Sequence, residues 1–258
     1  MKTPIRIVAA GMMLLAPATA LAECKATSPD HSVALVELYT SEGCDSCPPA
    51  DRWLSRFDDA RDAGRVVALA LHVDYWDRLG WKDRFASPAY TDRQREEVRR
   101  QRSAFAYTPQ VVLDGRDFRE WHSDGGPATA IASINTNPAR ATIELAAEPR
   151  GNNVTVDMRV LVPAARDRAH AVVMVALAQS GLVSDVKAGE NAGRRLAHDH
   201  VVRQWLAGPP LDANGEARAQ LSFALPADPG PLSIVAFAED SKSGEVLQAL
   251  ALPLCARF

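Results

Sequence analysis

The first half of the chain alternates apolar strands with amphipathic helices. Residues 33–40 and 65–73 are apolar runs rich in β-branched side chains, which predicts strands buried in a parallel sheet. Between them, apolar residues recur at helical spacing over residues 48–63, which predicts a helix. A further helix is expected over residues 88–104, where Pro88 follows Ser87 at a typical helix start. Strand, helix and strand in this order predict an α/β domain built on a βαβ unit.

The second half of the chain has a different pattern. A helix is expected over residues 126–134, and the Asn-Thr-Asn-Pro sequence at residues 135–138 then marks a boundary. Beyond it, short apolar runs alternate with turn sequences, which predicts an antiparallel β-sandwich or barrel. The predicted strands are residues 141–147, 154–162, 169–178, 201–206, 217–225, 232–239 and 246–254. We therefore expect two domains, one over residues 23–137 with a helical insertion and a β-sandwich-like one over residues 138–258.

Residues 1–22 have the three parts of a signal peptide. Lys2 and Arg6 supply a basic start, residues 7–15 an apolar core, and Ala20-Leu21-Ala22 a cleavage site with small residues. Cleavage after Ala22 would release a periplasmic or secreted protein. No later run is long enough to span a membrane, and a net charge of −3 provides no electrostatic reason to expect nucleic acid as a partner.

The four cysteines are the candidates for chemistry. An oxidising compartment favours disulfides, and spacing makes Cys44 and Cys47 one pair and leaves Cys24 and Cys255 for a structural bridge. Cys44 and Cys47 precede the predicted helix of residues 48–63, whose N-terminal dipole favours a thiolate. Cys44 is the predicted attacking sulfur, and Cys47, one turn later, would resolve the mixed disulfide. This chemistry requires sulfurs that a partner can reach.

A second informative stretch contains Thr108 and Pro109. It opens a strand expected over residues 110–113, which leads into an Asp-Gly hairpin turn. A Cys-x-x-Cys pair at a strand–helix junction, followed by Thr-Pro before a hairpin, resembles the thioredoxin-like superfamily. The resemblance implies that the peptide bond before Pro109 is cis, that Pro109 lies against the cysteine pair, and that the backbone preceding it pairs with substrate.

Three segments together resemble a more specific group. Residues 36–51, 72–77 and 107–115 are similar to the secreted bacterial proteins grouped as domain of unknown function 1223, and the similarity continues through the Gly-Glu-Asn-Ala-Gly sequence at residues 189–193. The fold class that this resemblance and the strand pattern predict is an α/β thioredoxin-like domain followed by an all-β sandwich or barrel-like domain. Because the role of that family is not established, the resemblance supports fold and export more than reaction.

Three other groups of polar residues have candidate roles. Thioredoxins keep a buried carboxylate on the strand before the cysteines as a proton relay, and the resemblance makes Glu37 the candidate here. Glu37 lies one residue further from Cys44 than that pattern has, and a strand-end or paired carboxylate is the alternative. His198 and His200 alternate and would share one face of a strand, where a structural or surface role is favoured over metal binding. Residues 189–193 lack the strand-to-helix setting of a phosphate loop and are expected to form a turn.

Three functions fit these residues. The first is an exported thiol–disulfide oxidoreductase without a cofactor, in which Cys44 attacks, Cys47 resolves and Thr108 and Pro109 shape the substrate groove. Its partners would be protein thiols or disulfides, small thiols and a further redox protein. The second is a periplasmic thioredoxin-like binding protein in which Cys44, Cys47 and His72 hold copper or zinc, with a buried histidine bonded to backbone as the alternative for His72. The third is a redox-silent binding module with a permanently closed Cys44–Cys47 bridge.

Overall fold

The computed structural model of the protein describes residues 24–227 and 230–255, so the signal peptide expected over residues 1–22 lies outside the described part. The helical elements, with η for a 3-10 helix, are α1 (Pro48–Leu54), η1 (Asp77–Leu79), α2 (Pro88–Arg100), η2 (Arg119–His122), α3 (Gly126–Asn135) and α4 (Ala165–Arg168). The strands are β1 (Cys24–Thr27), β2 (Ala34–Thr40), β3 (Val66–His72), β4 (Gln110–Leu113), β5 (Arg116–Asp117), β6 (Thr142–Arg150), β7 (Asn153–Leu161), β8 (Ala171–Gln179), β9 (Leu182–Asp185), β10 (Arg195–His198), β11 (Val201–Ala207), β12 (Glu216–Ala224), β13 (Leu232–Asp240) and β14 (Val246–Pro253).

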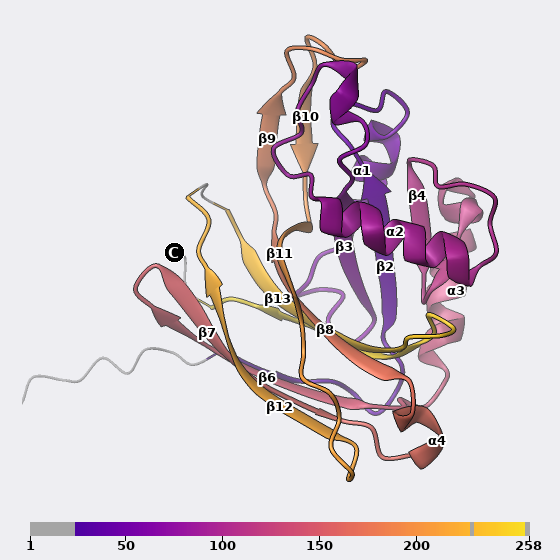
Figure 1. Cartoon of the computed structure of the whole chain (residues 1–258), viewed down its shortest axis with the longest axis vertical. Helices are drawn as coiled ribbons and strands as arrows, with labels where there is room; N and C mark the ends of the chain where they lie inside the picture. Colours follow the sequence, from indigo (N-terminus) through magenta and orange to yellow (C-terminus); the bar gives the residue numbers. More distant parts are fainter. Residues whose placement is uncertain (1–23, 228–229, 256–258) are drawn as a thin grey trace, which may run out of the picture.

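The central sheet is mixed and has eight strands in the order β14-β13-β8-β11-β3-β2-β4-β5. β2 and β3 run parallel, and every residue of both strands is buried, as predicted for strands covered on both faces. β11 joins them in parallel through Val201 and Ala70, and it pairs antiparallel with β8 on its other side. Strands from the C-terminal half of the chain therefore extend the sheet that carries the βαβ unit (Figure 1).

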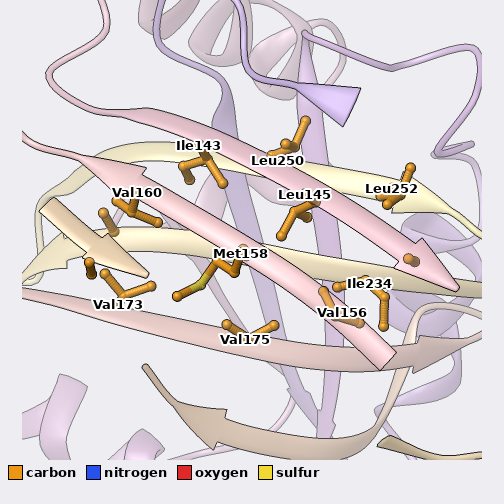
Figure 2. Packing of buried hydrophobic residues seen from close by; sticks show 14 of the residues in the cluster. Ile143, Leu145, Val156, Met158, Val160, Val173, Val175, Ile234, Leu250 and Leu252 are labelled. Carbon is orange, nitrogen blue, oxygen red and sulfur yellow. The ribbon is translucent and has the colours of Figure 1, made fainter. Parts of the chain in front are cut away.

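A second sheet is antiparallel, has the order β1-β6-β7-β12, and packs on β8, β13 and β14 (Figure 2). Residues of β7 alternate between buried and more exposed positions, as in a strand with one face on the core. The buried positions of both layers form one apolar cluster that includes Ile143, Leu145, Met158, Val175 and Ile234. Within the described residues both sheets keep two open edges, so the barrel alternative is wrong and the antiparallel strands form open layers.

Helices cover both faces of β2 and β3. Ala34, Val36 and Leu38 point to the face that packs on α1 and α3, whereas Leu35 and Tyr39 point to the opposite face, where α2 lies. Because side chains alternate along a strand, this arrangement decides which side of the sheet each polar residue of β2 reaches.

Several local features differ from the prediction, and α2 ends at Arg100 instead of residue 104. α1 ends at Leu54 instead of continuing to about residue 63. The Asp58 carboxylate accepts hydrogen bonds from the backbone N–H groups of Ala60 and Arg61, and it thereby offers these groups an alternative to helical bonds. The apolar pattern also does not predict β1, β9 and β10, since four residues are too few to establish a period.

A disulfide joins the two ends of the described chain. It links Cys24 in β1 with Cys255 after β14, with 5.8 Å between the Cα atoms, and these are the two cysteines that the sequence leaves for a structural bridge. This bond and a second disulfide are consistent with export to an oxidising compartment. Among the described residues, none of the helices combines the length and the apolar composition of a membrane span. The central sheet takes strands from both sides of residue 138. The division into two domains near that residue stays a prediction.

Candidate functional site

Cys44 and Cys47 lie at the junction of β2 and α1, as predicted. β2 ends at Thr40, and a turn then carries the chain to α1, for which Cys47 is the residue before the first helical position. The N–H of Cys44 donates to the Ser41 carbonyl at 3.2 Å, and the Cys47 carbonyl accepts from the N–H of Asp51 at 3.1 Å. The two sulfurs are bonded to each other, with 5.5 Å between the Cα atoms. The structure therefore contains the oxidised form of the pair.

Both cysteines are completely buried. Cys44 and Cys47 each have 0% of their surface exposed to solvent, which is the opposite of what exchange with a partner requires. The cover is a hairpin formed by β9, β10 and the loop of residues 186–194 between them, and β10 lies against α1 (Figure 1). In this conformation a thiol has no path to either sulfur.

Asn191, in the loop of this hairpin, is the main contact with the turn that holds the cysteines. Its side-chain amide donates to the carbonyls of Glu42 at 2.9 Å and Cys44 at 2.8 Å. Arg194 donates to the Asn191 side-chain oxygen at 2.6 Å and so fixes the orientation of the amide. On the outer side of the turn, the Glu190 carboxylate accepts from the N–H of Asp45 at 3.2 Å. The loop therefore binds the backbone of the turn at three points.

The Gly-Glu-Asn-Ala-Gly sequence is a turn, as expected, and its position explains its first glycine. Gly189 has a φ of +74°, which strongly favours glycine, and a Cβ there would come within 3.3 Å of the Trp81 Cβ. Sequence reasoning missed the role of this loop over the cysteines. The contact joins residues 147 positions apart, from Cys44 to Asn191, so no local pattern reveals it.

Pro109 follows a cis peptide bond, which confirms the prediction for Thr108–Pro109. Gln110 pairs with Tyr39 in the ladder between β4 and β2, so Thr108 and Pro109 lie at the end of the sheet from which the cysteine turn starts. Trp76 connects the two segments. Its indole N–H donates to the Thr108 hydroxyl at 2.8 Å, and its Cβ lies 3.2 Å from where a Cβ on Gly43 would be.

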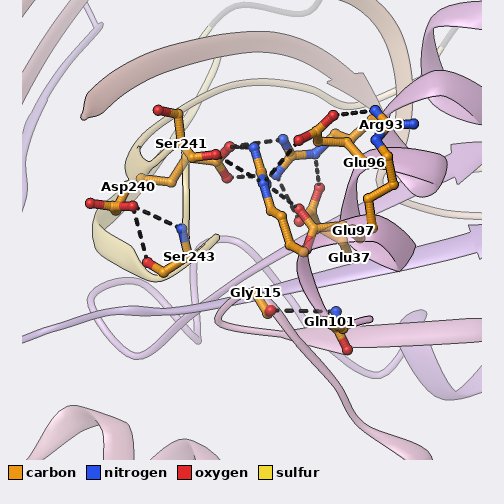
Figure 3. A network of polar contacts seen from close by, with 12 residues as sticks. Glu37, Arg93, Glu96, Glu97, Gln101, Gly115, Asp240, Ser241 and Ser243 are labelled. Atoms are coloured by element: carbon orange, nitrogen blue, oxygen red, sulfur yellow. Dashed lines mark hydrogen bonds and ion pairs between the residues drawn. The ribbon is translucent and has the colours of Figure 1, made fainter. Parts of the chain in front are cut away.

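Glu37 is a paired carboxylate in a network of polar contacts (Figure 3). It accepts two hydrogen bonds from the Arg93 guanidinium, at 2.5 and 2.9 Å, and Arg93 also binds Glu239 at 2.9 Å. Arg93 belongs to α2, whereas α1 and the cysteines lie on the opposite face of β2. The paired-carboxylate alternative therefore describes Glu37, and the structure offers no geometry for a proton relay from Glu37 to Cys47.

Two histidines and two carboxylates form a buried polar cluster beneath the hairpin. His72 Nδ1 lies 2.6 Å from Asp83 Oδ2, and His198 Nε2 lies 3.3 Å from Glu42 Oε1. The two imidazole rings meet edge to face with 5.0 Å between centroids. His72 is thus buried as the alternative expects, but its ring nitrogen pairs with a carboxylate instead of the backbone. The indole N–H of Trp81 donates to the second Glu42 oxygen at 2.7 Å.

Charge and burial oppose each other in this cluster. Burial alone would lower the pKa of His72, but the neighbouring Asp83 carboxylate outweighs it and raises that pKa above its usual value. Burial would raise the pKa of Asp83, yet the charge of His72 and its hydrogen bond lower it. Asp51, one turn after Cys47, has a pKa raised by burial, and its carboxylate accepts from the Thr40 hydroxyl at 2.7 Å.

Metal ligands do not converge in the described part of the chain. No group of three or more His, Cys, Asp or Glu side chains there is placed to hold a metal ion. His198 and His200 do not share a face, because His200 has a φ of +57° and its ring turns to the Phe57 carbonyl, at 3.0 Å. In the alternative metal site, Cys44 and Cys47 are bonded to each other in a disulfide, and His72 is paired with Asp83.

Comparisons with known proteins identify the family and the fold. The sequence profile described as "Protein of unknown function (DUF1223)" matches residues 35–238. No curated protein matches the chain. Protein AGR_C_4864 from Agrobacterium tumefaciens is similar in structure, with a TM-score of 0.58 and 25% identity over 87% of this chain and 96% of that one. HBP35 of Porphyromonas gingivalis, a thioredoxin-like protein, has a TM-score of 0.63 and 16% identity over 87% of this chain and 76% of its own.

Proposed function

We propose a function for this chain, which belongs to the DUF1223 family of proteins of unknown function: it is an exported thiol–disulfide oxidoreductase that acts through Cys44 and Cys47. The observation that carries the proposal is the bonded Cys-x-x-Cys pair between β2 and α1, with Thr108 and Pro109 at the same end of the sheet. The finer assignment of a thioredoxin-like domain, followed by a β-sandwich domain, belongs to the same proposal. The substrates are protein or small-molecule thiols and disulfides.

The proposed reaction transfers two electrons in two thiol–disulfide exchanges. A substrate thiolate attacks the Cys44 sulfur, the Cys44–Cys47 bond breaks, and Cys47 leaves as a thiolate. A second substrate thiolate then attacks the substrate sulfur of the mixed disulfide and releases Cys44. The substrate dithiol becomes a disulfide, the protein becomes a dithiol, and the protons of the substrate thiols pass to the leaving cysteines. Reduction of a substrate disulfide is the same sequence in reverse.

Asp51 is the carboxyl group that we assign to proton exchange with Cys47, in place of Glu37. It follows Cys47 by one helical turn, so the two side chains share a side of α1. Burial raises its pKa, which favours the protonated acid that can supply a proton to a leaving thiolate. Replacing Asp51 by Asn should change the pH profile of disulfide reduction while leaving the disulfide intact.

Trapping of a mixed disulfide tests the proposal. In the Cys47→Ser variant, Cys44 keeps its sulfur and has no resolving partner, so exported protein should accumulate disulfide-linked complexes through Cys44. The matched control is Cys44→Ser, which should trap far less, because Cys47 lies behind Cys44 at the start of α1. Absence of complexes from both variants, together with no exchange with glutathione in the folded protein, would contradict the proposal.

A redox-silent module is the second candidate, and one specific observation favours it: both sulfurs are buried beneath Asn191 and the hairpin. In that case the Cys44–Cys47 bond would only stabilise the turn before α1. Incubation of the folded protein in glutathione buffers of different potential, followed by alkylation of free thiols, separates the two. A reversible, potential-dependent fraction of reduced pair supports the oxidoreductase, and a pair that stays bonded until the protein unfolds supports the silent module.

A further inference from the structure

The β9–β10 hairpin is attached to the rest of the fold by a narrow stem. Within the described residues it forms a sheet of its own two strands and pairs with no other strand. It leaves the central sheet at Gly181, which has a φ of +73°, and returns at His200, which has a φ of +57°. At the stem, the Gly181 N–H donates to the Asp199 carboxylate at 2.8 Å, and the His200 N–H donates to the Ser180 hydroxyl at 3.0 Å. These bonds bring the two ends of the hairpin together.

The tip of the hairpin supplies the partners of the cysteine turn. The carbonyls of Glu42 and Cys44 accept from the Asn191 amide, and the Asp45 N–H donates to the Glu190 carboxylate. These are polar contacts through a few side chains, which can be broken without unfolding the central sheet. They place Asn191, with 0% exposure, directly over Cys44.

The interface under the hairpin is incompletely satisfied. Two buried ring nitrogens there, His72 Nε2 and His198 Nδ1, have no hydrogen-bond partner. His198 Nε2 and Glu42 Oε1 form an ion pair at 3.3 Å. Buried polar atoms normally find partners, and each one without a partner destabilises the closed arrangement. Burial of the apolar side chains Leu182, Val186 and Leu196 offsets this loss and stabilises the closed hairpin.

From the narrow stem, the polar contacts of the tip and the unsatisfied interface, we propose that the β9–β10 hairpin is a lid over the Cys44–Cys47 disulfide, with Asn191 as its latch. The closed lid excludes thiols, and exchange takes place when the hairpin moves away about its stem. The proposal rests on the proposed function in that the lid regulates that reaction. Its physical content, control of access to the disulfide, is measurable without any substrate.

The rate of reduction by dithiothreitol tests the lid. Both thiols of the reagent give up their electrons to Cys44–Cys47, which becomes two thiols while the reagent becomes its cyclic disulfide. Cys24–Cys255 in the same molecule serves as an internal control, since its Cys255 end is already exposed while the hairpin is closed. Alkylation of the samples at intervals, followed by mass spectrometry, follows the two bonds separately under native conditions.

Substitutions of the latch should accelerate reduction of Cys44–Cys47 alone. Asn191→Ala removes both hydrogen bonds to the turn and should raise the rate about 10–100-fold, the effect of two lost buried hydrogen bonds. Asn191→Asp keeps an acceptor for Arg194 but places a second acceptor against two carbonyls, so its rate should be higher still. Lys187→Ala, at an exposed position of the same loop, is the matched control and should react like the wild type.

The outcomes separate the lid from the proposed function. Rates of the Asn191 variants equal to wild type would overturn the lid, and so would equal acceleration of both disulfides, which indicates general destabilisation. Selective acceleration of Cys44–Cys47 supports it. If acceleration is selective but Asn191→Ala combined with Cys47→Ser still captures no partner, the lid stands and the oxidoreductase proposal fails. If capture rises in that combination, both are supported.

Discussion

Asp114 is a carboxylic acid in a position that favours its neutral form. It lies in the turn between β4 and β5, and its side chain accepts the backbone N–H of Leu35 at 2.8 Å. Burial, with a smaller contribution from the charge of Glu245, raises the pKa of Asp114 to about 7. A group whose pKa is raised on folding costs stability as the pH rises above its unfolded value. The free energy of unfolding should therefore fall between about pH 4 and pH 7.

Asp114→Asn should remove this loss of stability. Asn keeps the acceptor for Leu35 and tolerates the positive φ of 48° at this position. At pH 8 the variant should be more stable by about 1–3 kcal/mol, since each pKa unit is worth roughly 1.4 kcal/mol and part of it is screened. At pH 4 the two proteins should be nearly equal. Urea unfolding at both pH values measures the difference, and an equal change at the two values would contradict the assignment.

His72 and Asp83 should stabilise the protein in a window of pH. The pKa of Asp83 is lowered, so its contribution is present above its unfolded value of about 4 and lost as the pH falls through the folded value. The pKa of His72 is raised, so its contribution is complete below about 6.5 and lost as the pH rises through the folded value. Between these limits both groups are charged, and the pair is strongest.

Asp83→Asn should therefore lower the free energy of unfolding most in that pH window. Near pH 5.5 it removes the carboxylate that keeps the buried His72 charged and should lower the free energy of unfolding by about 3 kcal/mol. Well above the folded pKa of His72, the imidazole is neutral in both proteins and the difference should shrink. Asp92→Asn, on the exposed side of α2, is the control and should change little at any pH. Thermal unfolding across pH 5 to 9 gives the profile, and a difference that does not depend on pH would argue against the ion pair.

At the scale of elements, Arg93 connects α2 to two strands of the central sheet. Its guanidinium binds Glu37 of β2 and Glu239 of β13, and all three side chains are nearly buried (Figure 3). β2 belongs to the βαβ unit and β13 to the C-terminal half of the chain. One side chain therefore holds segments far apart in the sequence against the same helix.

Arg93→Ala should destabilise the protein strongly, because it leaves the buried Glu37 carboxylate without its cation and leaves Glu239 with Arg100 alone. Loss of one member of a buried ion pair typically costs about 3–5 kcal/mol. Arg95→Ala removes an exposed arginine of the same helix, paired with Asp92 at 3.1 Å, and should cost less than about 0.5 kcal/mol. Chemical unfolding measures both. Arg93→Met combined with Glu37→Gln and Glu239→Gln should recover part of the loss, and similar costs for the two Ala variants would exclude this role of Arg93.

The elements that could be predicted are those whose signals are local. β2, β3 and α2 have apolar runs or caps that lie within one window of the sequence, and the position of Cys44 follows from them. The hairpin has no such signal: β9 and β10 are four residues each, and the polar Ser184 and His198 occupy buried positions. Glu37 shows a different limit of prediction from the sequence. The sequence places it on β2, but only the packing of α1 and α2 reveals that it faces away from the cysteines.

For the whole molecule, the shared central sheet predicts cooperative unfolding. β11 lies between β3 and β8, so separation of the two halves of the chain would leave unpaired strands at that point. We expect one transition in urea, with the same midpoint by tryptophan fluorescence and by far-ultraviolet circular dichroism. Trp53 lies in α1, whereas Trp205 of β11 packs against Tyr90 of α2 and Phe237 of β13, so Trp205 reports on the contact between the two halves. Two separated transitions would instead support two independent domains.

The bond between Cys24 and Cys255 makes the described chain a closed ring of covalent linkages, since it spans a sequence separation of 231 residues. A protease that cuts any single exposed turn inside this ring, such as the one at Gly151, opens the ring without dividing it into pieces. The nicked protein would migrate as one band on a gel until a reductant is added. Proteolytic breakdown therefore needs a second cut or loss of the bridge before any fragment can leave.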